Sequence, residues 1–311
     1  MRKTSLNSVL ELAKRDPRVL FIGSDLGSGT LDAFRAAYPE RFFMEGIAEQ
    51  NLIGMAAGLA MEGFIPYVNT IASFLTRRCL EQIAIDLCLH NLPVRLIGNG
   101  GGVVYAPLGP THLAPDDIAL MRAMPNMTIL APADAVQMRA CMAKTLDWPG
   151  PVYIRLAKGG DQVVCREDDP CAIGVANRMR PGVDALFITT GVMAQRALAA
   201  REILLADGIE CGVLHLHTVK PLDEAALLEA ANAFPLLVTL EEHSLIGGLG
   251  SAVAELLIDH GLATPLLRLA LPDHFIEHYG SQEELLGWLG LDPATIAARV
   301  ARKLSGIRSR K

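Results

Sequence analysis

The feature that most constrains the fold of this chain is an alternation of short apolar segments with longer, helix-like segments. The pattern occurs in two successive blocks, and each block is typical of β-strands that alternate with α-helices. Strands connected in this way form parallel sheets that the helices cover on both faces. We therefore predict an α/β fold with two doubly wound domains, each built on a parallel sheet.

The first block is predicted to hold five strands and at least four helices. The strands are expected at residues 19–23, 64–68, 94–97, 128–130 and 152–154, and the helices at 4–15, 74–91, 135–145 and directly after Met44.

The second block is predicted to hold four strands and five helices. The strands are expected at 185–189, 211–215, 236–240 and 266–269, and the helices at 194–207, 223–233, 249–260, 281–289 and 293–305.

A change of composition, with the charged run Arg166-Glu-Asp-Asp-Pro170 inside it, separates the two blocks. We predict a first domain over residues 1–165, a linker over 166–181 and a second domain over 182–311. A chain of 311 residues is long enough for about two domains.

Composition excludes several classes of function. The net charge of −6 weighs against a nucleic-acid surface, and no apolar run is long enough to span a membrane. The N-terminus has no apolar stretch typical of a signal peptide. None of the six cysteines forms a Cys-x-x-Cys pair, and most lie in apolar runs typical of small core residues. We expect a cytoplasmic protein with neither nucleic acid nor membrane as partner.

The loops that follow the strands are the expected ligand site, because ligands of such sheets bind at the carboxyl ends of the strands. These loops are residues 23–30, 44–49, 69–74 and 98–115. The first is a Gly-rich turn that contains Asp25 and lacks both common phosphate-binding motifs.

The stretch from Phe42 to Gly63 contains a carboxylate at the mouth of an apolar helix. Glu49 lies in the first turns of this helix, where the helix dipole tolerates a negative charge. Gly54 and Gly58 leave room for another backbone, and the mainly apolar composition predicts burial nearly all round. Glu49 is therefore either a cap for free amide groups or an acid with a chemical role.

A second notable stretch is Gly109-Pro-Thr-His112 in the long loop over 98–115. A histidine on a Gly- and Pro-rich loop is expected to be half-exposed and able to titrate near neutrality. The alternative is that His112 caps a nearby helix.

The two stretches together resemble the transketolase group of thiamine-diphosphate enzymes. Gly46-Ile-Ala-Glu-Gln-Asn51 is similar to the group's cofactor signature, and Gly-Pro-Thr-His is shared by transketolase and deoxyxylulose-phosphate synthase. The resemblance covers the whole chain. It implies a pyrimidine-binding domain followed by a transketolase C-terminal domain.

The resemblance implies three residues that contact thiamine diphosphate. Glu49 would contact the aminopyrimidine ring and activate the cofactor, and Phe74 would pack on that ring. Asp25 would lie near the cofactor and the partner chain. The alternative for Phe74 is a core residue at a helix start.

Four further residues are implied on the substrate side. His112 would contact substrate oxygens and assist proton transfer, which makes it catalytic together with Glu49. The expected contacts to the substrate phosphate are Arg155, Arg77 and Arg2. Each arginine could equally form a surface or interface ion pair.

The family's diphosphate-binding motif, Gly-Asp-Gly followed by Asn, does not occur in this chain. The resemblance therefore implies the C-terminal subunit of a split transketolase, with no metal ligands of its own. An N-terminal partner subunit would supply the diphosphate-binding domain and hold Mg²⁺, and self-association would give a heterotetramer.

The implied reaction is transfer of a two-carbon ketol unit from a ketose phosphate to an aldose phosphate. Leu108 stands where the family usually has Asp, and Gly100 and Gly101 stand where relatives carry polar side chains. Both departures affect the expected sugar specificity. The alternatives are a deoxyxylulose-phosphate-synthase-like enzyme, a 2-oxo-acid dehydrogenase beta subunit, or a non-catalytic regulatory subunit of the same fold.

Overall fold

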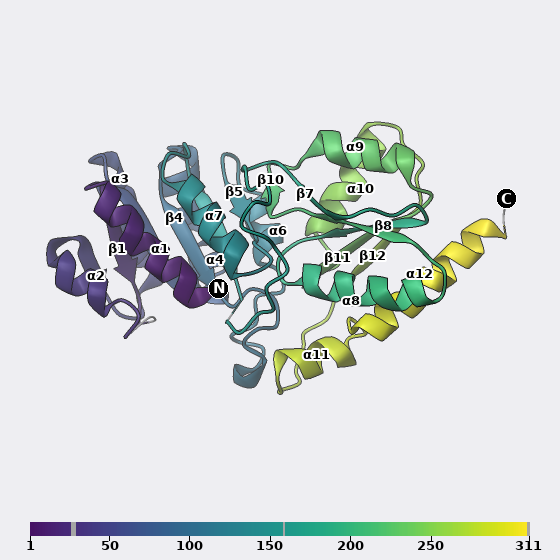
Figure 1. Ribbon diagram of the computed structural model, residues 1–311. Helices are drawn as coiled ribbons and strands as arrows, with labels where there is room; N and C mark the ends of the chain where they lie inside the picture. The colour runs from purple at the N-terminus through teal and green to yellow at the C-terminus, as the bar shows by residue number, and fades with distance from the viewer. Residues whose placement is uncertain (26–28, 158, 310–311) are drawn as a thin grey trace.

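A computed structural model describes residues 1–25, 29–157 and 159–309 of the chain. It contains two mainly parallel sheets that lie side by side, with helices on both faces of each (Figure 1). The predicted α/β fold with two doubly wound sheets is confirmed.

The first sheet has seven strands in the order β10-β5-β6-β4-β3-β1-β2. All its pairings are parallel except that of β10 with β5. The strands are β1 (Val19–Gly23), β2 (Phe42–Met44), β3 (Ile65–Ile71), β4 (Arg95–Asn99), β5 (Thr128–Leu130), β6 (Val152–Leu156) and β10 (Thr218–Lys220).

Two apolar cores cover this sheet, one on each face. One core contains side chains from α1 (Arg2–Arg15), α2 (Asp32–Ala37) and α7 (Ala135–Thr145). The opposite core contains side chains from α3 (Glu49–Met61), α4 (Ala72–Thr76), η2 (Ile83–Leu89) and α6 (Asp117–Arg122). Three short segments complete this part: η1 (Pro39–Arg41), α5 (Leu80–Gln82) and η3 (Ala106–Leu108).

The second sheet has five strands in the order β12-β11-β8-β9-β7, and only β7 runs antiparallel to its neighbour. The strands are β7 (Asn177–Arg180), β8 (Ala185–Thr189), β9 (Cys211–His215), β11 (Leu237–Ser244) and β12 (Leu266–Leu271). The helices are α8 (Met193–Ala206), α9 (Glu224–Ala233), α10 (Leu249–Asp259), α11 (Gln282–Trp288) and α12 (Pro293–Arg308).

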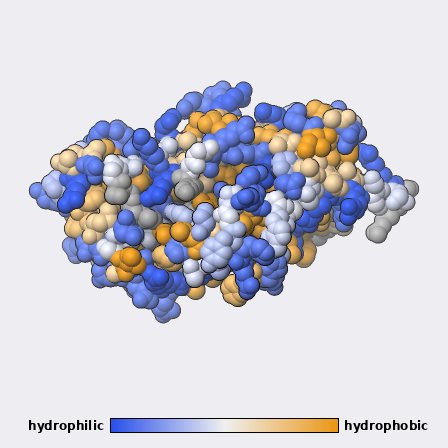
Figure 2. All heavy atoms as spheres, turned by 90° about the horizontal axis from the view of Figure 1, so that it is seen from below, coloured by the Kyte–Doolittle hydropathy of each residue, from blue (hydrophilic) through white to orange (hydrophobic). Residues whose placement is uncertain are grey.

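The helices of this second part also cover both faces of their sheet. Side chains of α8, α11 and α12 form the core on one face, and those of α9 and α10 form the core on the other. Seen from below, the molecular surface is mainly hydrophilic, with separate groups of hydrophobic side chains (Figure 2).

Two strands connect the parts of the chain in a way that the sequence did not indicate. β7 lies inside the predicted linker over 166–181 and adds an edge to the second sheet. β10 comes from the second block but pairs with β5 of the first sheet. The division of the chain at residues 165 and 182 stays a prediction.

The continuous helix predicted over residues 74–91 is wrong. α4 ends at Thr76, three residues form a turn, and the helix resumes as α5 and the π-helical η2. Arg77 and Arg78 lie in this turn and form ion pairs with different partners, Asp116 and Glu49. The turn therefore allows two adjacent arginines to reach opposite neighbours.

The prediction that the helix after Met44 is buried nearly all round is also wrong for this chain. In α3 one side is buried, and Gly54 and Gly58 lie on the exposed side with open space where a Cβ would stand. The cysteines agree with expectation, since five are buried and Cys171 is half-buried. Among the described residues, no helix is both long and apolar enough to cross a membrane.

Candidate active site

The candidate site forms where β1, β3 and the start of α3 meet at the carboxyl edge of the first sheet. Ser24, directly after β1, contacts the hydroxyl of Thr70 in β3 with an oxygen separation of 3.0 Å. The Thr70 hydroxyl in turn donates to Glu49 Oε1 at 3.5 Å. Asp25 joins the same chain of contacts, because the Ser24 hydroxyl also lies 3.0 Å from its Oδ1.

Glu49 is the first residue of α3, and its side chain is only 1% exposed. Its partners among the described residues are two side chains, the Thr70 hydroxyl and the Arg78 guanidinium. A capping carboxylate would instead accept a backbone N–H of the first helical turn. The contacts therefore favour a chemical role for Glu49 over the capping alternative.

Arg78 connects Glu49 to the two other residues that the motifs predicted. Its guanidinium forms an ion pair with Glu49 and lies 4.6 Å from the centre of the Phe74 ring. The Phe74 ring meets the His112 ring edge to face, with centres 5.1 Å apart. Glu49, Arg78, Phe74 and His112 thus form one continuous row.

Arg78 is a site residue that the sequence analysis missed. A buried carboxylate needs a charged or hydrogen-bonding partner, and this requirement was the one available signal for a nearby cation. The partner is 29 residues away in sequence, in a segment predicted as continuous helix, so the pairing was not visible.

His112 is half-buried at the end of the Gly-Pro-Thr-His turn. Its Nδ1 lies 2.9 Å from the Thr111 hydroxyl, and its carbonyl accepts from the Ser73 hydroxyl at 3.3 Å. Gly109 has a φ of +76°, and a Cβ there would stand 2.6 Å from the Tyr279 ring. The turn thus requires glycine both for its backbone conformation and for the close approach of Tyr279.

The three predicted phosphate-binding arginines do not join this row. Arg155 is buried, where its Nε donates to Asp117 at 2.8 Å and its Nη2 to the Glu242 carbonyl at 2.7 Å. Arg77 forms a two-pronged ion pair with Asp116. Arg2 is half-buried at the start of α1. Their roles toward a substrate stay predictions.

The departures at Gly100 and Gly101 have a steric reason. A Cβ on Gly100 would stand 2.2 Å from the Tyr105 ring, and a Cβ on Gly101 would stand 2.2 Å from Arg155 Nε. Neither position can carry a side chain while Tyr105 and Arg155 keep their places. Leu108, in contrast, is 49% exposed at the end of η3.

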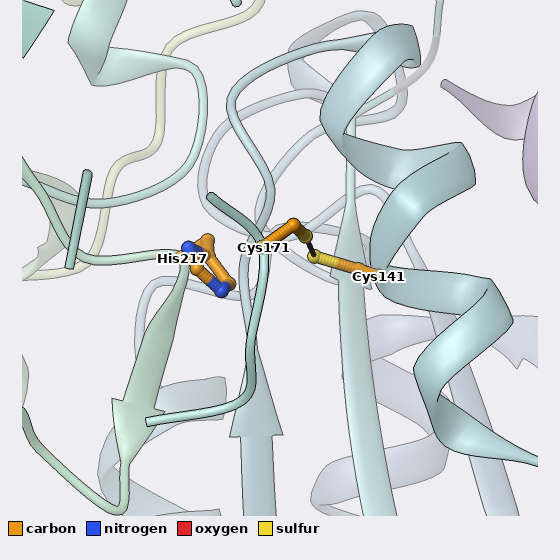
Figure 3. A group of neighbouring side chains, drawn as sticks. All are labelled: Cys141, Cys171 and His217. Atoms are coloured by element: carbon orange, nitrogen blue, oxygen red, sulfur yellow. Dashed lines mark hydrogen bonds between the residues drawn. The ribbon is translucent and has the colours of Figure 1, made fainter. Parts of the chain in front are cut away.

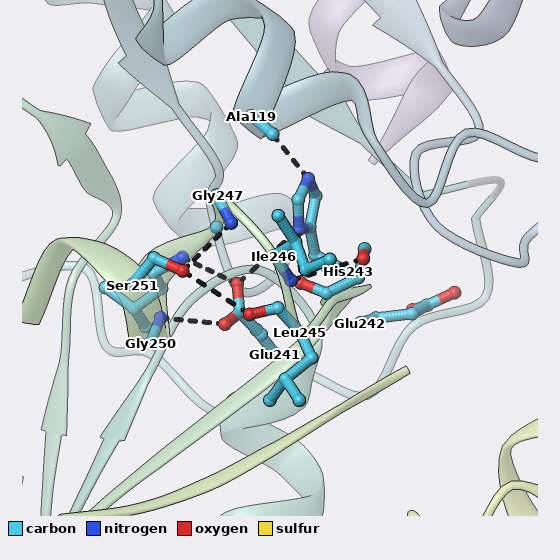
Figure 4. Close-up of polar contacts among 12 residues, drawn as sticks. Ala119, Glu241, Glu242, His243, Leu245, Ile246, Gly247, Gly250 and Ser251 are labelled. Atoms are coloured by element: carbon cyan, nitrogen blue, oxygen red, sulfur yellow. Dashed lines mark hydrogen bonds and ion pairs between the residues drawn. The ribbon is translucent and has the colours of Figure 1, made fainter. Parts of the chain in front are cut away.

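A second group that the sequence analysis missed lies at the end of β11, where Glu241, Glu242 and His243 are all buried (Figure 4). Glu241 accepts the backbone N–H groups of Leu249 and Gly250 at the start of α10. The Glu242 side chain points to the other side of the strand in Figure 4. Two adjacent acids in an apolar strand were the available signal.

Glu242 holds the long loop that ends at the Gly-Pro-Thr-His turn. Its Oε1 accepts the Val103 N–H at 2.7 Å, and both of its oxygens accept from Gln282 Nε2. Burial raises the pKa of Glu242 to about 7, against the opposing charges of Arg155 and Arg196. The carboxyl therefore changes charge in the neutral range, at a contact between the two parts of the chain.

We predict that the melting temperature of the wild-type chain decreases as the pH rises from about 5 to 7. Part of this decrease comes from Glu242 and should be absent in Glu242→Gln. The ordinary pKa of this carboxyl is 4.5 and the folded value is about 7, so the folded state binds more protons in that window. Stability is then highest at low pH and is lost as pH rises, by on the order of 3 kcal/mol for this group. Melting curves of both proteins from pH 5 to 8 measure the difference, and parallel curves would contradict it.

The residues of the row fit one part of thiamine diphosphate and not another. A buried carboxylate beside a half-buried aromatic ring suits an aminopyrimidine, which can stack and share a ring proton. Among the described residues, the one group of three His, Cys, Asp or Glu side chains close enough to share an ion is Cys141, Cys171 and His217. Mg²⁺ prefers oxygen ligands, which these three side chains do not supply.

Comparisons with known proteins identify the family of the chain. The family model described as "Transketolase, pyrimidine binding domain" matches residues 1–160, and "Transketolase, C-terminal domain" matches residues 174–296. A solved structure described as "Split gene transketolase, inactive beta4 tetramer" is 38% identical, with a TM-score of 0.90 and 98% coverage of each chain.

Curated relatives fall into two groups. The chain is 35% identical to a "Putative transketolase C-terminal section" of Methanocaldococcus jannaschii, covering 98% of this chain and 96% of that protein. It is 38% identical to a 6-deoxy-6-sulfo-D-fructose transketolase subunit of Clostridium sp. (strain MSTE9), covering 89% of this chain and 86% of that one.

The second group consists of longer proteins. The chain is 40% identical to a 1-deoxy-D-xylulose-5-phosphate synthase of Synechococcus sp. (strain JA-2-3B'a(2-13)), over 96% of this chain. It spans only 46% of the length of that synthase. With both family models matched and these relatives aligned over nearly the whole chain, the chain belongs to the transketolase family of thiamine-diphosphate enzymes.

Proposed function

We propose that this chain is the C-terminal subunit of a two-chain transketolase, which transfers a two-carbon ketol unit from a ketose phosphate to an aldose phosphate. The observation that carries the proposal is the row Glu49, Arg78, Phe74 and His112, which joins a carboxylate, an aromatic face and an imidazole. The carboxylate, the aromatic ring and the imidazole of this row are all present, which weighs against a purely regulatory subunit.

Each residue of the row has a distinct task in this proposal. Phe74 would stack on the aminopyrimidine, and Glu49 would share a proton with a nitrogen of that ring. Bound thiamine diphosphate would supply the nucleophilic carbon that cleaves and remakes the sugar C–C bond. His112 would donate and accept protons at the substrate oxygens, a task typically worth about 10²–10⁴-fold in rate.

Arg78 would hold the Glu49 side chain in place until the ring arrives. The arginine side chain is 43% exposed, so it can move aside without the cost of a fully buried ion pair. Its guanidinium would then remain near the Phe74 face, at the entrance to the site.

A partner subunit would complete the site. The side of α3 with Gly54 and Gly58 is open, and the exposed apolar side chains of Met61, the last residue of α3, and Ile47, just before the helix, lie near it in sequence. The neighbouring η2 adds exposed Ile85 and Leu89. An apolar surface beside Glu49 suits an N-terminal chain that brings the diphosphate- and Mg²⁺-binding residues.

Relatives of the same length support a split enzyme. The Methanocaldococcus jannaschii relative is named as a C-terminal section, and the similar solved structure of a split-gene transketolase is described as an inactive tetramer of beta chains. By analogy, we propose that this chain self-associates and that the active form is a heterotetramer with the N-terminal chain.

The donor distinguishes this proposal from its main alternative. The reconstituted two-chain complex is offered a ketose phosphate with an aldose phosphate, or pyruvate with an aldose phosphate. Turnover of the ketose phosphate supports transketolase, whereas turnover of pyruvate alone would establish the deoxyxylulose-phosphate-synthase alternative. Turnover of neither would support a non-catalytic subunit.

Leu108 is expected to change the substrate range relative to a transketolase with Asp at this position. A substrate hydroxyl held by Asp would lose its partner here, and a site that bonds a hydroxyl can discriminate strongly for it. Leu108→Asp should therefore raise kcat/KM for substrates that carry this hydroxyl. Kinetics on phosphorylated ketoses and aldoses, and on 6-deoxy-6-sulfo-D-fructose, measure the change.

Leu108→Ala is the matched control, because it removes the apolar side chain without adding an acceptor. Leu108 is 49% exposed, so neither variant is expected to disturb folding. A substrate profile that Leu108→Asp leaves unchanged would contradict the prediction.

A further inference from the structure

Three side chains of types that can bind a metal ion meet outside the candidate active site (Figure 3). Cys141 comes from α7, Cys171 from the connection between the two sheets, and His217 from the residue before β10. Their two sulfur atoms and one histidine nitrogen all lie within 4.8 Å of one another. Cys141 and His217 are fully buried, and Cys171 is half-buried.

The two ring nitrogens of His217 have different surroundings. Its Nε2 lies 3.1 Å from the carbonyl of Ala172, the neighbour of Cys171, and donates to it in the neutral ring. Its Nδ1 is buried and has no hydrogen-bond partner among the described residues. Burial lowers the pKa of His217, so this nitrogen keeps a free lone pair near neutrality. Metal-binding histidines almost always donate their second N–H in this way.

The two cysteines provide soft donors beside the His217 ring. Their sulfur atoms are 3.0 Å apart, closer than an ordinary contact between two thiols. A hydrogen bond from the Cys141 thiol lowers the pKa of Cys171 against burial, and Lys144 lowers it further. Cys171 is also the more accessible of the two cysteines.

We propose that Cys141, Cys171 and His217 bind one Zn²⁺ ion, through two thiolates and the Nδ1 of the imidazole. Thiolate and imidazole are the ligands that zinc prefers, at about 2.3 Å and 2.0–2.1 Å. Two thiolates on a tetrahedral zinc are about 3.8 Å apart, so the sulfur atoms must separate by less than about 1 Å. Binding releases both thiol protons to solvent. A water molecule would take the fourth position.

Such an ion would link three segments of the chain that are distant in sequence. It would fix the connection around Cys171 to α7 of the first part and to the segment that leads from β9 into β10. This is the place where the chain crosses from one sheet to the other and returns. The proposed role is to hold the connection in place, independently of the proposed enzymatic function.

The test is zinc content of the full-length chain, expressed without a histidine tag and purified with a reducing agent but no chelator. We expect about one zinc per wild-type chain by elemental analysis and native mass spectrometry. Cys171→Ser should lower the content at least about tenfold, since loss of even an outer partner typically weakens metal binding 10–100-fold. The matched control is Cys88→Ala, a buried cysteine in η2, and it should keep the full content.

A second measurement uses only the wild-type chain, so it does not depend on how a variant folds. Added Zn²⁺ should protect Cys141 and Cys171 from alkylation, whereas the remaining cysteines should react at unchanged rates. Equal zinc content in wild type and Cys171→Ser would overturn the proposal. So would a Cys141–Cys171 disulfide in the isolated chain that, once reduced, gains no protection from zinc.

Discussion

Glu49→Gln is expected to slow exchange of the proton on C2 of the thiazolium ring, the nucleophilic carbon of thiamine diphosphate, by about 10²-fold or more. The exchange is measured on cofactor bound in the two-chain complex. Gln keeps the size of Glu49 and can still accept from the Thr70 hydroxyl, but it cannot hold the shared proton. Assembly should survive, because the partner that loses its ion pair, Arg78, is 43% exposed and can turn to solvent. Proton exchange measured by NMR, beside a melting curve, separates the two effects.

The same variant also tests the capping alternative. If Glu49 only stabilised the start of α3, the loss should be up to about 1 kcal/mol of stability, with exchange nearly unchanged. Glu45→Gln is the matched control, since Glu45 is an exposed acid just before the helix. Exchange at the wild-type rate in a normally assembled Glu49→Gln complex would remove the proposed role of Glu49.

The parts of the fold that could be predicted are those in which a local pattern determines the structure. Inner strands such as β1 and β8 are buried on both faces, so they are nearly continuous apolar runs that the sequence displays. β7 and β10 are short edge strands with charged residues, and they exist because a distant strand offers a pairing edge. Such strands depend on tertiary structure and have no strong local signal.

The same distinction applies to the candidate site. Glu49, Phe74 and His112 lie in short motifs, and the structure brings these three together. Arg78 and Glu242 act through partners that are distant in sequence, Glu49 and Val103. No spacing rule connects such pairs, so only the folded chain reveals them.

The ion pairs of Arg155 and Arg77 are a further feature that the sequence does not reveal. The sequence predicts arginines near the carboxyl edge of the sheet, but it does not reveal whether a charge is already satisfied. Here Arg155 is paired with buried Asp117, and Arg77 is paired with Asp116. A role in phosphate binding would require either arginine to exchange its carboxylate for the substrate.

We propose that this chain supplies only half of an active site. The row around Glu49 would bind the aminopyrimidine, but Gly-Asp-Gly followed by Asn, which holds the diphosphate and its metal in this family, is absent. The isolated chain should therefore bind thiamine diphosphate weakly and have no transketolase activity.

The most direct measurement compares ketose phosphate turnover by the purified chain, with thiamine diphosphate and Mg²⁺ added, before and after addition of the N-terminal chain that carries Gly-Asp-Gly. Calorimetry on the same samples gives the affinity for the cofactor. We expect no turnover and weak cofactor binding by the chain alone, and turnover with tight binding once the partner is added. Turnover of ketose phosphates by the single purified chain would contradict it.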